Sequence, residues 1–309
     1  MGAYRDGGLF VLLSVLWGSS FVAIKAGLAH IPPVLFASLR YDIAGVCLLC
    51  YAAFATDRWL PRSRGDWTEV LVAAVLVIAV YNTFLFVGEQ GVTSGVAAIL
   101  VATSPILTTG FSRLLLPDSR LTPVGLLGLA CGFVGVVLVA VPDSGAITVE
   151  EVAAPGLVFL AAMSVALGSV LLERTESNIG TEGAVAWSFV LGAVIMHATS
   201  GALPGESVGD LAVTTEAVIA VGYLAVLASV VGYVIYFRLL ERLGAVDINL
   251  VSYAAPVVAT VVGWALLGET LEPLTVVGFC VIAVGFVLLK RRALAERSRT
   301  LRQALAGRS

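Results

Sequence analysis

Ten apolar stretches, each close to the length of a membrane-spanning helix, run through this chain of 309 residues. A helix needs about 20 apolar residues to cross the hydrocarbon core of a bilayer. Only 13% of the residues are charged, and no stretch is left for a large soluble domain. The sequence therefore predicts an all-α integral membrane protein. The ten expected helices are 9–28, 34–56, 67–88, 91–115, 121–141, 155–174, 181–202, 215–239, 245–267 and 273–290.

Lysine and arginine give these helices an orientation. All but two of the 18 Lys and Arg residues fall in alternate loops or in the C-terminal segment, and the loops between carry acids alone. Cytoplasmic loops of membrane proteins are enriched in Lys and Arg. We therefore expect a multi-pass protein of the cell membrane with both termini in the cytoplasm. Adding or removing one helix would reverse every later loop, so the pattern supports the count of ten.

The chain also repeats itself at an offset of 150 or 151 residues. Pro105 aligns with Pro256, Asp118 with Glu269, Pro123 with Pro273, Gly128 with Gly278 and Gly135 with Gly285. Five helices per copy is an odd number, so the second copy enters the membrane from the opposite side. The sequence predicts two inverted five-helix repeats, 1–145 and 150–292, followed by a cytoplasmic basic tail, 293–309. Such repeats open a midplane site to each side in turn.

Several motifs resemble the EamA family of the drug/metabolite transporter superfamily. They are Trp17-Gly18-Ser19-Ser20-Phe21 with Lys25, the run PPVLFASLR ending at Arg40, and Leu267-Gly268-Glu269 with Pro256 and Pro273. The resemblance covers about residues 9–290 and implies a ten-helix inverted-repeat carrier of small organic metabolites, often an exporter. The halves depart from each other: Pro117-Asp118 stands where the motif has Gly-Glu, and Leu167 and Val190 replace the Trp and Arg of the first repeat.

Three charges fall inside two consecutive helices. Lys25 lies about three residues from the outer end of its helix, so it either snorkels to the interface or lines a central cavity. Arg40 and Asp42 lie deeper, where a charge costs about 2.5–3.5 kcal/mol. Being two residues apart, they face opposite sides of their helix. We expect Arg40 to face the bundle interior and Asp42 to meet a neighbouring helix, too deep for a tight ion pair with Lys25.

Polar and aromatic residues within the helices complete the candidate lining of a substrate cavity. They are Trp17, Tyr81, Asn82, Ser104, Trp187, Tyr233, Tyr236 and Tyr253. Each of them also fits a packing role or an interfacial belt. Pro105 and Pro256 are expected to bend their helices, and Asp118 and Glu269 follow those helices as candidate gating residues. Lys25 and Arg40 together would favour an anionic or zwitterionic solute.

The sequence carries no signature of an enzyme or of an ATP-driven pump. The sequence motifs of zinc-dependent hydrolases, of serine nucleophiles and of P-loops are absent. We expect no catalytic residue, no metal site, no cofactor and no nucleic acid partner. The expected function is secondary-active transport of small organic metabolites such as amino acids or amphipathic compounds, by alternating access, with export as the expected direction. A passive channel and an integral-membrane enzyme are the alternatives. The expected partners are the solute and the lipid bilayer, and a homodimer is left open.

Overall fold

A computed structural model describes residues 2–115, 123–140, 149–206, 208–244, 248 and 250–306. Throughout these ranges the chain consists of helices and short connections, with no strand. In the same part of the chain, eight helices are long and apolar enough to cross a membrane, and two further apolar helices are shorter. The all-helical membrane fold predicted from the apolar stretches is confirmed.

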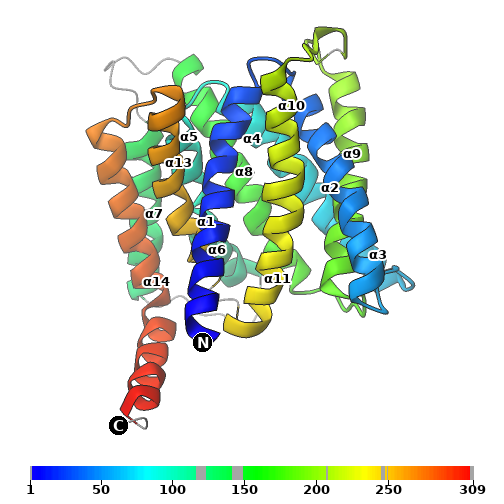
Figure 1. The fold of residues 1–309 in the computed structure, drawn as a ribbon. Helices are drawn as coiled ribbons and strands as arrows, with labels where there is room; N and C mark the ends of the chain where they lie inside the picture. The colour runs from blue at the N-terminus through cyan, green and yellow to red at the C-terminus, as the bar shows by residue number, and fades with distance from the viewer. Residues whose placement is uncertain are drawn as a thin grey trace.

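The elements form an upright bundle of helices (Figure 1). In chain order they are α1 (Gly2–Gly27), α2 (Pro33–Ala55), α3 (Arg64–Val72), η1 (Ala73–Val80), α4 (Tyr81–Glu89), α5 (Ser94–Val101), α6 (Ser104–Leu115), α7 (Pro123–Ala140), α8 (Val149–Leu172), α9 (Thr181–Ala202), η2 (Val208–Asp210), α10 (Thr215–Gly222), η3 (Tyr223–Val231), α11 (Gly232–Leu243), α13 (Val251–Leu267) and α14 (Pro273–Ala306). The bounds lie near the predicted ones, except at the two ends of the chain.

Both terminal helices are longer than the sequence predicted. Helix α1 begins at Gly2, and α14 continues to Ala306, through the segment expected to be a basic tail. Residues 293–306 are mostly Ala, Leu, Arg and Glu, which are strong helix formers, and contain no Gly or Pro to end the helix. The apolar pattern marks where a membrane span ends, and the helix itself runs on beyond it.

Three of the spans are composite. Spans Arg64–Glu89 and Thr215–Leu243 are continuous helices with a π-helical segment in the middle, η1 and η3 respectively. These two segments begin 150 residues apart, at Ala73 and Tyr223. Span Ser94–Leu115 is interrupted between α5 and α6. The two π-helical segments thus stand at matching places in the two halves.

Helices α7 and α14 pack through glycines. A Cβ atom on Gly128 would lie 2.7 Å from the carbonyl oxygen of Gly285, and one on Gly285 would lie 2.6 Å from that of Gly128. Gly135 and Gly278 repeat the arrangement at 2.7 and 2.8 Å. Only residues without a side chain let two backbones approach so closely. The earlier glycine of α7 faces the later glycine of α14, so the two helices run antiparallel.

Other packing pairs follow the same offset. Helix α2 packs against α9, its counterpart in the second half. Helix α1 packs against α13, and α8 packs against α5 and α6 in the corresponding way. Large apolar side chains cover the outside of the bundle, with Phe54 exposing 93% and Trp264 66% of their surface. Such a surface suits contact with lipid, and the chain is a multi-pass membrane protein.

The loops gather at two opposite ends of the bundle. At one end Arg242 Nη1 pairs with Asp6 Oδ1 at 2.9 Å, and the Gly180 amide donates to the Arg58 carbonyl at 2.8 Å. The two chain ends lie on this side (Figure 1). At the other end the Ala212 amide donates to the His30 carbonyl at 2.9 Å. Of the loops predicted to be cytoplasmic, those near Arg58, Gly180 and Arg242 therefore share one end of the bundle with the start of α1.

Candidate functional site

Arg40 lies inside the bundle on α2 and exposes 9% of its surface. Its Nε atom donates to Ser229 Oγ in η3 at 3.1 Å. Its Cζ atom lies 4.9 Å from the centre of the Tyr41 ring, within the range of a cation–π contact. Arg40 thus points inward, as the sequence predicted, and its charge is held between a hydroxyl and an aromatic face.

Asn82 adds an amide beside this cation. Its Nδ2 atom donates to Tyr41 Oη at 3.2 Å and to the Ile78 carbonyl at 2.7 Å. Asn82 is fully buried, and its Oδ1 atom has no hydrogen-bond partner among the described residues. A buried amide oxygen without a donor costs free energy. This oxygen therefore lacks a hydrogen-bond donor in the present arrangement.

Aromatic rings link these polar groups to the second half of the chain. Phe189 of α9 meets Tyr41 edge-on at 4.6 Å between ring centres and Tyr233 of α11 at 5.1 Å. Trp17 of α1 lies 5.7 Å from Tyr233 and 5.6 Å from Tyr236. Phe189 is fully buried, whereas Trp17, Tyr233 and Tyr236 are half-buried. We call the whole set the central cluster: Trp17, Arg40, Tyr41, Asn82, Phe189, Ser229, Tyr233 and Tyr236.

The π-helical segments position this cluster. Segment η1 ends directly before Tyr81 and Asn82, and η3 contains Ser229 and ends two residues before Tyr233. A π-turn shifts the register of the residues that follow it and is frequent at functional sites. Gly232, the residue directly after η3, leaves room for Trp17, because a Cβ atom on Gly232 would lie 2.8 Å from Trp17 Nε1. Trp17 Nε1 instead donates to the Ala228 carbonyl at 3.1 Å.

Lys25 binds backbone rather than a carboxylate. Its Nζ atom donates to the carbonyls of Glu89, Gln90 and Val92 at 2.9, 3.0 and 2.9 Å. These carbonyls lie where the helix of α4 ends, the negative end of a helix dipole. Lys25 therefore joins α1 to the end of α4. The choice between an interfacial and a cavity-lining role stays a prediction.

Asp42 meets α9, a neighbouring helix, as predicted. Its Oδ2 atom lies 2.7 Å from His197 Nε2, and His197 Nδ1 lies 3.2 Å from Ser38 Oγ. No ion pair joins Asp42 to Lys25, and both residues are described. His197 of α9 thus has partners at two positions of α2.

Three carboxylates lie at the same end of the bundle as Lys25. Two of them accept hydrogen bonds at the start of a helix, and the third belongs to the last residue of a helix. Glu269 accepts from the Ser94 amide at 3.1 Å and from Ser94 Oγ at 3.2 Å, at the start of α5. Glu206 accepts from the amides of Val34 and Leu35 at the start of α2. Glu89 is fully buried, and neither of its carboxylate oxygens has a hydrogen-bond partner among the described residues.

The remaining sequence candidates lie outside the central cluster or at its margin. Tyr81 is half-buried beside Asn82. Tyr253 packs on Phe286 at 4.4 Å between ring centres, and its buried hydroxyl has no partner in the described chain. Trp187 Nε1 donates to the Trp59 carbonyl at 3.1 Å, near the end that carries the basic loops. These contacts do not bring Trp187 to Arg40.

The predicted bends take two forms. Pro105 lies in the first turn of α6, after the break that separates α6 from α5. Ser104 Oγ donates to the Val101 carbonyl at 2.6 Å and so satisfies one carbonyl freed by the break. Pro256 lies inside α13, which continues through it. Asp118 lies outside the described residues.

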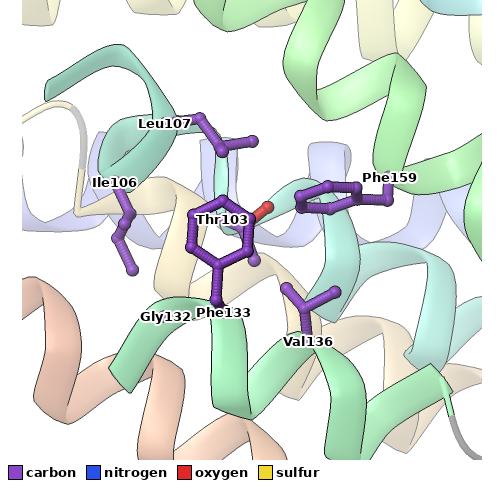
Figure 2. A pocket seen from close by; sticks show the side chains of 7 residues that line it. All are labelled: Thr103, Ile106, Leu107, Gly132, Phe133, Val136 and Phe159. Atoms are coloured by element: carbon purple, nitrogen blue, oxygen red, sulfur yellow. The ribbon is translucent and has the colours of Figure 1, made fainter. Parts of the chain in front are cut away.

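A small pocket lies away from the central cluster. It is lined by Thr103, Ile106, Leu107, Gly132, Phe133, Val136 and Phe159 (Figure 2). The Thr103 hydroxyl, the polar group of this lining, donates to the Leu100 carbonyl at 2.6 Å. Phe133 is exposed on the outside of α7. The pocket is apolar and offers no free polar group to orient a solute.

The described residues contain no group of three or more His, Cys, Asp or Glu side chains that could hold a metal ion. The chemistry that the central cluster offers is binding of a small molecule. It offers a cation, an unpaired amide oxygen and several aromatic faces, contributed by helices from both halves of the chain. The sequence profile of the EamA-like transporter family matches residues 7–141 and again residues 154–291.

The chain belongs to the EamA-like transporter family. The uncharacterized inner membrane transporter YedA of Escherichia coli strain K12 is 31% identical over 284 residues, covering 92% of this chain and 89% of YedA. The uncharacterized transporter YvbV of Bacillus subtilis strain 168 is 26% identical, over 95% of this chain and 94% of YvbV. A crystal structure with 20% identity superposes with a TM-score of 0.63, over 95% of this chain and 98% of the other. That last likeness concerns the fold alone.

Three residues of the central cluster, and Glu89 outside it, escaped the sequence interpretation. Tyr41, Phe189 and Ser229 read as ordinary residues of apolar helices, since nothing in their spacing identifies a partner on another helix. Glu89 ends an apolar stretch, a position where a carboxylate at the membrane surface needs no special explanation. Its complete burial is visible only in the folded chain.

Proposed function

We propose that this EamA-like transporter is a secondary carrier of small organic solutes, built from ten transmembrane helices in two inverted repeats. The observation that carries this proposal is the reciprocal glycine contact between α7 and α14. An axis in the membrane plane relates Gly128 to Gly278 and Gly285 to Gly135. A half-turn about such an axis exchanges the two halves of the chain. It places the contact of Gly128 with Gly285 onto the contact of Gly278 with Gly135, and both contacts are present.

The count of ten is supported by the packing of the two shorter helices. Helix α13 and the apolar part of α14, Pro273–Leu289, each have at most 17 residues. At 1.5 Å per residue they extend about 25 Å, close to the thickness of the hydrocarbon core. Helix α13 packs against α1, and α14 packs against α7, which are both long enough to span. We therefore count both shorter helices as membrane crossings.

Alternating access follows from how the central cluster is divided. Trp17, Arg40 and Asn82 come from the first half, and Ser229 and Tyr233 from the second. A rocking movement of one half against the other would separate these groups and admit a solute between them. Arg40, Tyr41 and Asn82 are buried here, so the present arrangement is a closed one.

The chemistry of the cluster favours a zwitterionic solute with an apolar body, such as an amino acid. A guanidinium binds carboxylates through paired hydrogen bonds. The free Oδ1 atom of Asn82 can accept from an ammonium group, and Trp17, Tyr233 and Tyr236 offer rings to an apolar side chain. Export across the cell membrane is the direction that the family resemblance favours, and the basic loops favour a cytoplasmic position for both termini.

Transport by purified protein in liposomes tests this function. A panel of radiolabelled amino acids and organic cations would be offered with and without a pH gradient. A carrier shows saturable uptake that accelerates when unlabelled solute is present on the opposite side. The matched control for the site is Arg58→Ala, since Arg58 is exposed in a loop. Flux that neither saturates nor responds to opposite-side solute would indicate a channel and overturn the proposal.

A further inference from the structure

Glu89 is the most unusual titratable group in the described part of the chain. It lies at the end of α4, exposes 0% of its surface, and has no hydrogen-bond partner at either carboxylate oxygen among the described residues. Glu206, at the same end of the bundle and 7% exposed, instead accepts from two backbone amides. Burial without a partner is therefore particular to Glu89 and not a property of the acids at this end.

The nearest cation does not neutralise this carboxylate. A lysine ammonium has three donors, and the three of Lys25 are matched by the carbonyls of Glu89, Gln90 and Val92. No ion pair joins Lys25 to the Glu89 carboxylate, although both side chains are described. Lys25 thus binds the backbone carbonyl of Glu89 and makes no ion pair with the Glu89 side chain.

The other charged groups around Glu89 do not replace a partner. Arg40, on α2, gives its Nε atom to Ser229. Glu269, which follows α13, is itself an acid and caps the start of α5, so it cannot neutralise Glu89. The residues of α5 include no titratable group. Helix α8 lies against Gly88 and Gly91 through Ala154, and its acids Glu150 and Glu151 precede that contact. Tyr81 is the titratable neighbour on α4 itself. The C-terminal end of α4 is also the negative end of its dipole.

A carboxylate in such a place takes up a proton, because an isolated buried charge costs far more than neutralisation. A bound metal cation is a poorer solution at this position. It would need the backbone carbonyl oxygens nearby as further ligands, and Lys25 already occupies three of them with a positive charge. A proton needs no other ligand.

We propose that Glu89 is a proton-binding site of this carrier and controls closure of the end that carries Lys25. The proposal rests on the proposed carrier function. In the present arrangement Glu89 is a neutral acid, and Lys25 holds α1 to the end of α4. When Glu89 releases its proton to water, the carboxylate withdraws Lys25 from the three carbonyls. The resulting ion pair still joins α1 to α4, but the segment at Gln90 and Val92 loses its tie to α1 and is released. Reclosure takes up a proton again, so the transport cycle includes a protonation step.

Infrared difference spectroscopy of the purified protein in bilayers tests the protonation directly. The wild-type protein is expected to show the carbonyl stretch of a protonated carboxylic acid at neutral pH. Glu89→Gln, which preserves size, should lose that band, and the matched control Glu206→Gln should keep it. Absence of the band in the wild type, or its persistence in Glu89→Gln, shows an ionised Glu89 and overturns the proposal.

Cysteine accessibility tests the coupling to Lys25. A Val92→Cys probe would be placed in a protein whose four native cysteines are replaced, and its labelling by an impermeant maleimide compared with that of Val208→Cys. The ratio of the two rates removes the pH dependence of thiol reactivity. We expect the ratio to rise several-fold with external pH, and to stay low at every pH when Glu89→Gln is added.

An equal rise of this ratio in the Glu89→Gln protein would show that Glu89 does not control the contact, and would overturn the second half of the proposal. Neither experiment uses a transported solute. Failure to find a solute in the liposome panel would therefore challenge the carrier function and leave the result on Glu89 standing. If Glu89 is protonated in a protein that transports no solute of the panel, the proton-binding site stands and the carrier function is overturned.

Discussion

Arg40 Nε donates to Ser229 Oγ at 3.1 Å, and this bond joins α2 in the first half of the chain to η3 in the second. The bond has no counterpart across the repeat. Val190 stands 150 residues after Arg40, and Ala79 stands 150 residues before Ser229. Neither side chain can form a hydrogen bond. The two halves share a fold, yet this hydrogen bond is made in one direction only, and a solute bound at Arg40 would bind asymmetrically.

Arg40→Ala is expected to abolish or strongly reduce transport while the protein still inserts. Charge-assisted hydrogen bonds contribute about 1.5–3 kcal/mol, so their loss should lower transport efficiency about 10- to 100-fold. The measurement is the initial rate per folded protein in liposomes, with any solute of the panel that the wild-type protein carries. Arg40 is buried and has no short route to the membrane surface, so an anchoring role does not account for it.

Two companion variants separate charge from geometry. Arg40→Lys keeps the charge but loses the planar fork that binds a carboxylate, and it should recover only part of the rate. Ser229→Ala removes the partner of Arg40 in η3 and should reduce the rate less than Arg40→Ala does. Wild-type rates in Arg40→Ala, at normal expression, would show that Arg40 is structural and that the central cluster is not the solute site.

Lys25→Met should destabilise the protein more than it slows transport. The change leaves three carbonyls at the end of α4 without their donor, and we expect a loss of about 1.5–3 kcal/mol in the free energy of unfolding. Thermal unfolding in detergent measures it, with Lys25→Arg as the variant that retains a donor. A transport defect larger than that of Arg40→Ala would contradict this ranking.

The glycine contact between α7 and α14 makes a symmetric prediction. Gly135→Ala and Gly278→Ala each place a Cβ atom within 3 Å of the partner backbone, and overpacking of this kind costs about 1–3 kcal/mol. The two losses should be similar, and the double variant should lose less than their sum, because both act on one contact. Thermal unfolding midpoints in detergent provide the measurement.

Gly156→Ala is the matched control for this pair. Gly156 is also a helical glycine, on α8, but a Cβ atom there would meet nothing within 4 Å. Alanine favours a helix over glycine by about 1 kcal/mol, so stability should stay equal or rise. Additive losses in the Gly135→Ala, Gly278→Ala double variant would mean that the two glycines do not share one contact.

The sequence predicted the helices well because membrane spans are set by apolar length alone. It also proposed Arg40, Asn82 and Tyr233 as candidate lining residues. The structure brings these three into one cluster, and their role as the lining of a solute path stays a prediction. Their partners Tyr41 and Phe189 were not predicted. Helical periodicity shows which residues share a face of one helix, whereas the choice of the facing residue depends on how two distant helices pack.

Lys25 shows the same limit in another way. Its sequence position fixed its depth, and depth correctly argued against a tight pair with Asp42. The carbonyls that it binds belong to backbone at the end of α4, and backbone groups leave no trace in the pattern of side chains. The composite spans escaped prediction for a related reason, since η1 and η3 read as uninterrupted apolar helix.

Orientation in the membrane gives the last prediction. The loop that contains Val208 lies at the end of the bundle opposite to the basic loops, and Val208 exposes 73% of its surface. Since basic loops stay in the cytoplasm, Val208→Cys in a protein without native cysteines should react with an impermeant reagent on intact cells. Asp57→Cys, exposed at the basic end, should react only after permeabilisation. Labelling at position 57 in intact cells would reverse the orientation, and with it the assignment of Glu89 to the external side.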